Sequence, residues 1–121
     1  MAEVCILGEK LIGEQLSSVE FVQDYLQLHF DDKYFIIYVW PKIIIDNRRY
    51  SIDDDAYRNK LCSLIGLLVS KIEHIENESL KLVFENEKGE IEINLNSSNP
   101  EIVSEIAIFS DKYDDIWMIF D

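Results

Sequence analysis

The chain has few of the residues on which many kinds of chemistry depend: two cysteines, two histidines and four glycines among 121 residues. Cys5 and Cys62 have no metal-ligand or redox spacing, and two histidines cannot form a His-rich zinc site. No glycine lies in a phosphate-binding loop, a dinucleotide fingerprint or a nucleophile elbow. We therefore expect no metal, no cofactor and no catalytic residue, so the protein is predicted not to be an enzyme. A carboxylate pair is the alternative, but among 24 acidic residues some pair always lies close, so this signal has little specificity.

Long hydrophobic runs are also absent. The longest ones, Phe35–Trp40 and Leu64–Val69, are far too short to cross a bilayer. Near the N-terminus Glu3 appears without an early Lys or Arg, so no secretory n-region is present. These features predict a cytoplasmic protein without a membrane partner. Reduced cysteines are the default there, and a disulfide between the two is the alternative.

Cationic residues are scarce: the chain has 11 Lys and Arg but 24 Asp and Glu, which gives a net charge of −13. Such a field repels nucleic-acid phosphates and anionic membranes, and it attracts cationic proteins. We therefore expect no direct nucleic-acid partner. The charge can equally serve solubility alone.

What the sequence does contain is an internal repeat, residues 11–40 and 64–96. Both copies begin with the letters LIG, and YLQLHF and YFIIYV in the first copy match SLKLVF and EIEINL in the second. Apolar residues alternate with period two in both, which predicts that one face of each strand is buried. The residues expected in the core are Leu26, Leu28, Phe30, Phe35, Ile37, Val39, Leu80, Leu82, Phe84, Ile91, Ile93 and Leu95.

Each copy is predicted to form a leading strand followed by an antiparallel hairpin, with Gly89 supplying a positive φ in the second turn. Pro41 and the segment Asp46–Tyr50 are expected to interrupt the strands. A helix is predicted over residues 53–65, capped by its leading aspartates and ended by Gly66. Residues 104–120 are expected to form a last hairpin. The predicted fold class is α+β, mainly antiparallel β from a duplicated three-stranded meander with one central helix, in a single domain over 1–121.

The two copies differ on their outward faces. Glu90, Glu92 and Asn94 are typical of a solvated strand, whereas the first copy has Tyr34, Ile36 and Tyr38 there, with Trp40 next in phase. Either the central helix or the C-terminal hairpin covers this aromatic face, or a partner binds it. The candidate partner-binding residues are Asp31, Asp32, Tyr34, Tyr38, Trp40 and Asp46, with the three aspartates as an acidic ring.

Three stretches carry a resemblance to a known group of proteins: LIG followed by VEFVQDYLQLHF, LCSLIG followed by LKLVFENEKGEIEINL, and SEIAIF followed by IWMIF. Over residues 11–120 they resemble small bacterial proteins, some of them encoded beside polymorphic toxins. The layout is similar to that of immunity proteins of contact-dependent growth inhibition systems. These stretches are core patterns and transfer no functional residue.

The resemblance implies that the chain binds and neutralises one cognate toxin, a basic protein such as a cationic nuclease, in the cytosol. Two alternatives from other classes remain open. The chain could act as an acidic mimic of DNA, which requires carboxylates spaced like phosphates, or as an adaptor that binds a less basic protein through the aromatic face.

Overall fold

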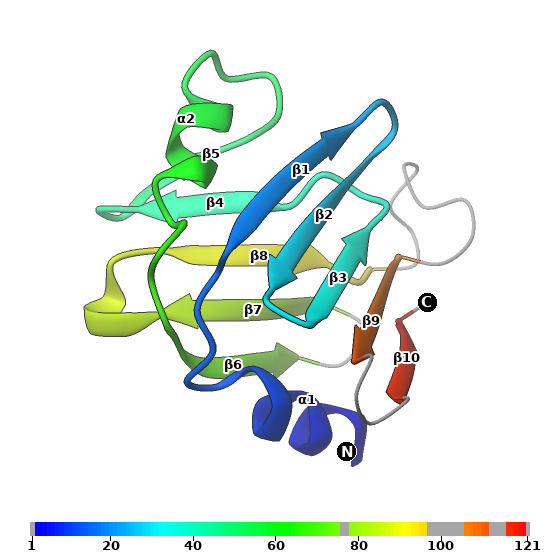
Figure 1. The fold of residues 1–121 in the computed structure, drawn as a ribbon. Coiled ribbons are helices and arrows are strands. Elements are labelled where there is room, and N and C mark those ends of the chain that lie inside the picture. Colours follow the sequence, from blue (N-terminus) through cyan, green and yellow to red (C-terminus); the bar gives the residue numbers. More distant parts are fainter. Residues whose placement is uncertain (1, 76–77, 97–105, 112–115, 121) are drawn as a thin grey trace.

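The computed structural model describes residues 2–75, 78–96, 106–111 and 116–120. They form two five-stranded antiparallel sheets, one in front of the other, whose strands cross obliquely (Figure 1). The first sheet contains, in spatial order, β1 (Ser18–Val22), β2 (Tyr25–Phe30), β3 (Lys33–Ile37), β9 (Ala107–Asp111) and β10 (Ile116–Phe120). The second contains β5 (Arg48–Tyr50), β4 (Lys42–Ile45), β8 (Glu90–Asn94), β7 (Ser79–Phe84) and β6 (Val69–Ile75). The predicted α+β class, mainly antiparallel β, is confirmed.

The two predicted meanders are β1–β2–β3 and β6–β7–β8, and they pair in the same register. Leu28 faces Val19 and Phe35 in the first meander, and Leu82 faces Ile72 and Ile91 in the second. The strands therefore match residue for residue along their inner faces. A register shift between Val69 and Lys71 distinguishes the second copy.

The duplication extends beyond the meanders, because each one acquires a hairpin from the other half of the chain. Strands β4 and β5 follow the first meander but add to β8 in the second sheet. Strands β9 and β10 follow the second meander but add to β3 in the first sheet. Ile43 lies opposite Ile91 just as Phe109 lies opposite Phe35. The expected interruption at Asp46–Tyr50 holds for its first two residues: Asp46 and Asn47, both at positive φ, end β4 and form the tight turn of this hairpin. The other three residues form strand β5, which was not predicted.

Each half also begins with a helix, so the expectation of one central helix is incomplete. Helix α1 (Ala2–Leu11), which was not predicted, contacts β6, the first strand of the other meander. Helix α2 (Tyr57–Cys62) contacts β1 in the same reciprocal way, and also β4. Lys10 of α1 lies 3.5 Å from the buried carboxylate of Asp111 on β9. Each helix is therefore tied to both sheets.

The two LIG segments meet where the halves cross. The Gly13 amide donates to the Val69 carbonyl at 2.8 Å, and the Gly66 amide donates to Leu16 at 2.8 Å. The amides of Leu16 and Val69 donate in turn to Leu67 and Glu14. These bonds form two pairs related by the repeat. Gly13 and Gly66 both have positive φ, 89° and 97°. Gly13 lies two residues after the end of α1, but α2 has its C-cap at Ser63, so the prediction that Gly66 ends this helix is wrong.

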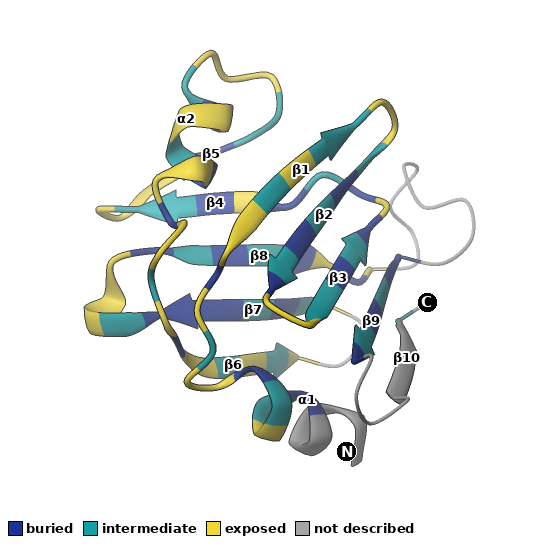
Figure 2. Cartoon of the chain, in the orientation of Figure 1, coloured by how far each residue is buried: buried dark blue, intermediate teal, exposed yellow. Residues whose placement is uncertain are grey.

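All twelve residues expected in the core are buried. They belong to one apolar cluster that takes side chains from both sheets. Buried and half-buried residues alternate along β2, as the period-two pattern predicts (Figure 2). Most of the strand prediction therefore holds because burial on one face leaves its trace in the sequence.

Helix α2 is shorter than residues 53–65. Its N-cap is Ala56, which has no capping side chain, so the expected aspartate cap is wrong. Asp54 instead accepts a hydrogen bond from the Ser51 amide at 2.7 Å in the preceding turn. Tyr57, Leu61 and Leu64 of the predicted apolar stripe are buried, but Ile65 is exposed.

Gly89 is needed for a different reason from the one expected. Its φ is not positive; Asn86 and Glu87 take the left-handed conformation in this turn. A Cβ at Gly89 would overlap the side chain of Leu64 and crowd Ile45. The last hairpin is present as β9 and β10, and residues 104–105 and 112–115 of its expected range lie outside the described residues.

Truncation of the two equivalent core leucines tests the duplicated architecture. We expect Leu28→Ala and Leu82→Ala each to lower the free energy of unfolding by about 2–5 kcal/mol, because each leaves a cavity between the sheets. Urea denaturation measures both. Gln27→Ala, on the outward face beside Leu28, is the control. A loss below about 1 kcal/mol at both leucines contradicts the assignment of the inner faces.

Candidate functional site

The outward side chains of the first sheet form the candidate site, which we call the open face. Strand register groups them in rows, for example His29 beside Tyr34 and Ser110, or Gln27 beside Ile36 and Ile108. The described members of the open face are Ser18, Glu20, Val22, Tyr25, Gln27, His29, Tyr34, Ile36, Tyr38, Ile108 and Ser110. Most are half-buried, as on a sheet surface that only its own neighbours shield.

No described element covers the open face (Figure 1). Helix α2 packs against β1 of the first sheet and β4 of the second, and its Arg58 lies over the inward-facing ring of Phe21, 5.5 Å from the ring centre. The C-terminal hairpin adds to the edge of β3 and widens the sheet. The sequence left two interpretations of the aromatic face: cover by the helix or the hairpin, or a partner-binding surface. In the described residues neither the helix nor the hairpin covers this face.

Aromatic side chains occupy both ends of the open face. Tyr38 is 39% exposed and packs against Tyr25, with ring centres 5.6 Å apart and planes tilted by 47°. Tyr34 lies beside His29 at 6.2 Å. Ile36 and Ile108 occupy the row between these two pairs. Rigid rings with a polar tip make low-entropy anchors for a protein partner.

The described charged side chains around these rings are carboxylates. Glu20 lies on the edge strand β1, Asp24 in the β1–β2 turn, and the exposed Asp31 and Asp32 in the β2–β3 turn. None of the side chains described on the open face is Lys or Arg. Lys33 has the inward phase and lies 3.2 Å from Glu14. The rings are thus flanked by carboxylates at both ends and along one edge.

Four of the six predicted residues, Asp31, Asp32, Tyr34 and Tyr38, lie on the open face or at its end. Trp40 and Asp46 do not, so the expected acidic ring of Asp31, Asp32 and Asp46 does not form. Asp46 occupies the β4–β5 turn and lines a hollow of about 430 Å³ on the second sheet. The hairpin that carries Asp46 joins the other sheet, and local sequence does not reveal this.

Trp40 departs from the phase of β3 because the chain leaves the first sheet after Ile37. The segment Tyr38–Pro41 crosses to the second sheet, and the Trp40 ring stacks on Phe21 at 6.4 Å and 24°. The buried Tyr57 hydroxyl of α2 donates to the Pro41 carbonyl at 2.6 Å. Helix α2 thereby fixes the crossing and the orientation of Trp40.

Tyr25, Glu20 and Asp24 were not predicted. Tyr25 alternates with Gln27 and His29 along β2, so the period-two pattern already places it on the outward face. That Tyr25 lies beside Tyr38 can be known only from the register of β2 and β3. Glu20 could have been found in the same way, because it lies in the strand that pairs with β2.

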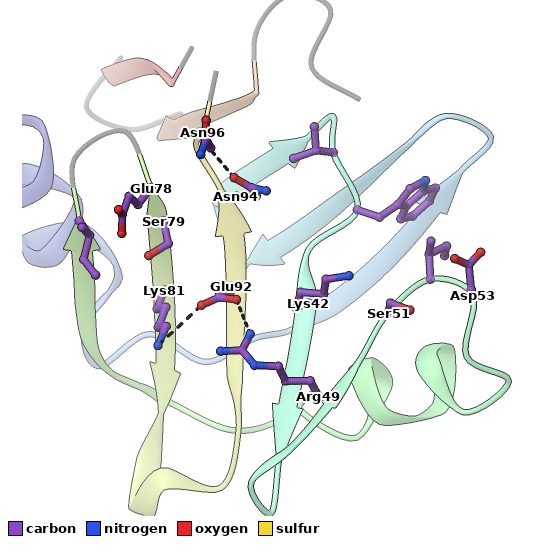
Figure 3. A pocket seen from close by; sticks show the side chains of 14 residues that line it. Lys42, Arg49, Ser51, Asp53, Glu78, Ser79, Lys81, Glu92, Asn94 and Asn96 are labelled. Carbon is purple, nitrogen blue, oxygen red and sulfur yellow. Dashed lines mark hydrogen bonds and ion pairs between the residues drawn. The ribbon is translucent and has the colours of Figure 1, made fainter. Parts of the chain in front are cut away.

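The outward face of the second sheet is different in kind. Its middle row alternates in charge from strand to strand, Glu73–Lys81–Glu92–Lys42. Glu92 lies 2.6 Å from Arg49 and 3.7 Å from Lys81 (Figure 3). The predicted solvated face of Glu90, Glu92 and Asn94 is thus a ladder of ion pairs that borders a cleft of about 610 Å³.

Searches with protein-family models, among curated proteins and among solved structures find no match to this chain. In the described part of the chain, no group of three or more His, Cys, Asp or Glu side chains is arranged to hold a metal ion. Neither described helix has the length and apolar content that crossing a bilayer requires. The geometry alone therefore defines the class: a two-sheet β protein with an aromatic face that no described element covers, and with carboxylates along its border.

The hydrogen bond that fixes the crossing segment should be measurable through its pH dependence. Burial raises the pKa of Tyr57 well above its ordinary value of 10.0. The folded state therefore keeps this phenol protonated, while the unfolded chain ionises above pH 10. We expect Tyr57→Phe to cost about 1 kcal/mol at neutral pH, since it leaves the buried Pro41 carbonyl without its donor.

The wild-type advantage is complete below pH 10.0 and is lost as the pH rises further. At one unit above that value the wild type should have lost about 1.4 kcal/mol relative to Tyr57→Phe, so the sign of the difference reverses and the variant becomes slightly the more stable protein. Urea denaturation at both pH values measures it, with Tyr34→Phe as the control on a half-exposed ring. A difference that does not change with pH contradicts the buried, protonated phenol.

Proposed function

We propose that the protein is a binding module without catalysis, an immunity protein that captures a basic toxin domain in the cytosol. The observation that carries this proposal is the open face, where no described element covers the aromatic anchors and the described charged side chains along their border are acidic. The net charge of −13 supports the same class of partner. The resemblance of the sequence to immunity proteins supplies the biological role.

Charge and aromatic rings have separate tasks in such a complex. The acidic field accelerates encounter with a cationic surface, and it weakens as salt screens it. Once docked, Tyr38 and Tyr34 can exclude water and bury their rings against the partner. A cationic nuclease carries basic residues where it holds phosphate, so an acidic face that docks there blocks substrate as well.

The arrangement of the acids bears on the DNA-mimic alternative. Mimicry requires carboxylates in rows with the spacing of phosphates. On the open face Glu20, Asp24, Asp31 and Asp32 surround a centre of tyrosine and isoleucine. A border of charge around aromatic anchors favours a protein partner with a mixed surface. The adaptor alternative differs only in the charge of its partner, and a salt series separates the two.

The salt dependence of association tests the charge. The ligand for this test is the cognate toxin domain. We expect its association rate to fall steeply as salt rises past physiological strength, where the Debye length is about 8 Å. Neutralising the border with Asp31→Asn and Asp32→Asn together should slow association and flatten the salt series, with little change in dissociation.

The matched control is Asp53→Asn with Asp55→Asn, which removes the same charge from exposed positions before α2. Stopped-flow mixing measures the rates. If both pairs slow association equally, net charge acts without a defined site. An association rate that does not change with salt concentration excludes a basic partner and favours the adaptor alternative.

Removal of a single ring tests the anchors. We expect Tyr38→Ala to speed dissociation roughly five- to thirty-fold, which corresponds to about 1–2 kcal/mol, with an unchanged association rate. Ile75→Ala is the control, because Ile75 is a large exposed apolar residue on the second sheet. Surface-capture kinetics with the same toxin domain give both rates. A Tyr38 variant that dissociates like wild type places the interface elsewhere.

A further inference from the structure

The cleft on the outward face of the second sheet is separate from the open face and has no role in the proposed function. It has a volume of about 610 Å³, within the range of small-molecule sites in proteins. Strands β4, β5, β7 and β8 contribute its polar floor through Lys42, Arg49, Lys81 and Glu92 (Figure 3).

Cations outnumber carboxylates on this floor. Glu92 lies between Arg49 at 2.6 Å and Lys81 at 3.7 Å, so one carboxylate is shared by two cations. Lys81 also lies 3.9 Å from Glu90, outside the cleft. Lys42 is the cross-strand neighbour of Glu92, is exposed, and forms no ion pair with a described side chain. The cleft as a whole is lined by three cations and three carboxylates, so it is neutral in a chain of charge −13, and its cations lie together on the floor.

The remaining polar groups flank the floor. Asp53 and Glu78 line the cleft from two different segments, one after β5 and one before β7 (Figure 3). Asn94 lies on the floor strand β8 and accepts a hydrogen bond from the Asn96 amide. The carboxylates of Asp53 and Glu78 thus lie on either side of the cationic floor. They would repel a long polyanion, but one small anionic group can bind between them.

One wall of the cleft is apolar. Val39, Trp40 and Ile52 line it. Stacking on Phe21 at 6.4 Å holds the indole of Trp40, and the hydrogen bond from Tyr57 to Pro41 holds the backbone beside it. The wall is therefore positioned before any ligand arrives. An indole held in this way offers a surface for a flat ring.

We propose that this cleft binds a small organic anion with a flat ring, placing its carboxylate or phosphate group on Lys42 and Arg49 and its ring against Trp40. Arg49 keeps further N–H donors when one nitrogen bonds Glu92, and the Lys42 ammonium forms no ion pair with a described side chain. The ladder of ion pairs holds the floor in place without the ligand. The site lies on the second sheet, so the ligand and the partner protein do not compete.

NMR titration of the labelled full chain tests the site with four probes. AMP and indole-3-acetate carry a ring with a phosphate or a carboxylate; adenosine and inorganic phosphate carry only one feature each. We expect AMP or indole-3-acetate to shift the amide signals of Lys42, Arg49 and Glu92, and the single-feature probes to bind at least about tenfold more weakly. The ring-bearing probe that binds tighter is then used with the variants.

Lys42→Ala should weaken the tighter probe by about tenfold or more, and Lys42→Arg should restore most of its affinity. Lys88→Ala, an exposed lysine in the β7–β8 connection, is the matched control and should change affinity less than about twofold. The absence of shifts in the cleft with every probe up to about 10 mM overturns the proposal, as does binding that Lys42→Ala leaves intact. Neither result bears on the open face.

Discussion

The structure depends on the crossing of the two halves of the chain. At residues 13–16 and 66–69 four backbone hydrogen bonds join the segments that follow the two helices, in pairs related by the internal repeat. From this crossing each helix packs on the first strand of the other meander, and each closing hairpin completes the other sheet. Neither half therefore completes a sheet alone, and the core between the sheets needs both. Contacts of such long range suggest slow, cooperative folding.

The two halves share this scaffold but have diverged on their outer surfaces. The inner residues must fill the same space, so Leu28 and Leu82, or Phe35 and Ile91, keep equivalent places. The outer residues face no such constraint. In the first sheet they are tyrosines and isoleucines without a described cation, and in the second they form alternating ion pairs. Because packing does not require this difference, it is the best guide to function that the molecule offers.

The candidate site could be predicted from the sequence only where its residues lie close together along the chain. Tyr34 and Tyr38 were found because both lie in or directly after one strand, where period two fixes the face. Trp40 was misplaced because the chain changes sheets within the four residues before β4, which ends the alternation. Asp46 was misplaced because its hairpin pairs with β8, a strand more than forty residues further on. Tyr25 becomes a neighbour of Tyr38 only through the β2–β3 pairing.

The sequence alone determined which side of each strand is buried, where the repeat lies and the sign of the charge, because burial on one face and a duplicated core leave periodic traces in the residues. Tertiary structure alone decided which strands become neighbours. Edge-to-edge pairing is made by backbone groups that every residue carries, so side-chain patterns do not name a strand's partner. The exchange of hairpins, the open face and the cleft beside Trp40 all follow from those pairings.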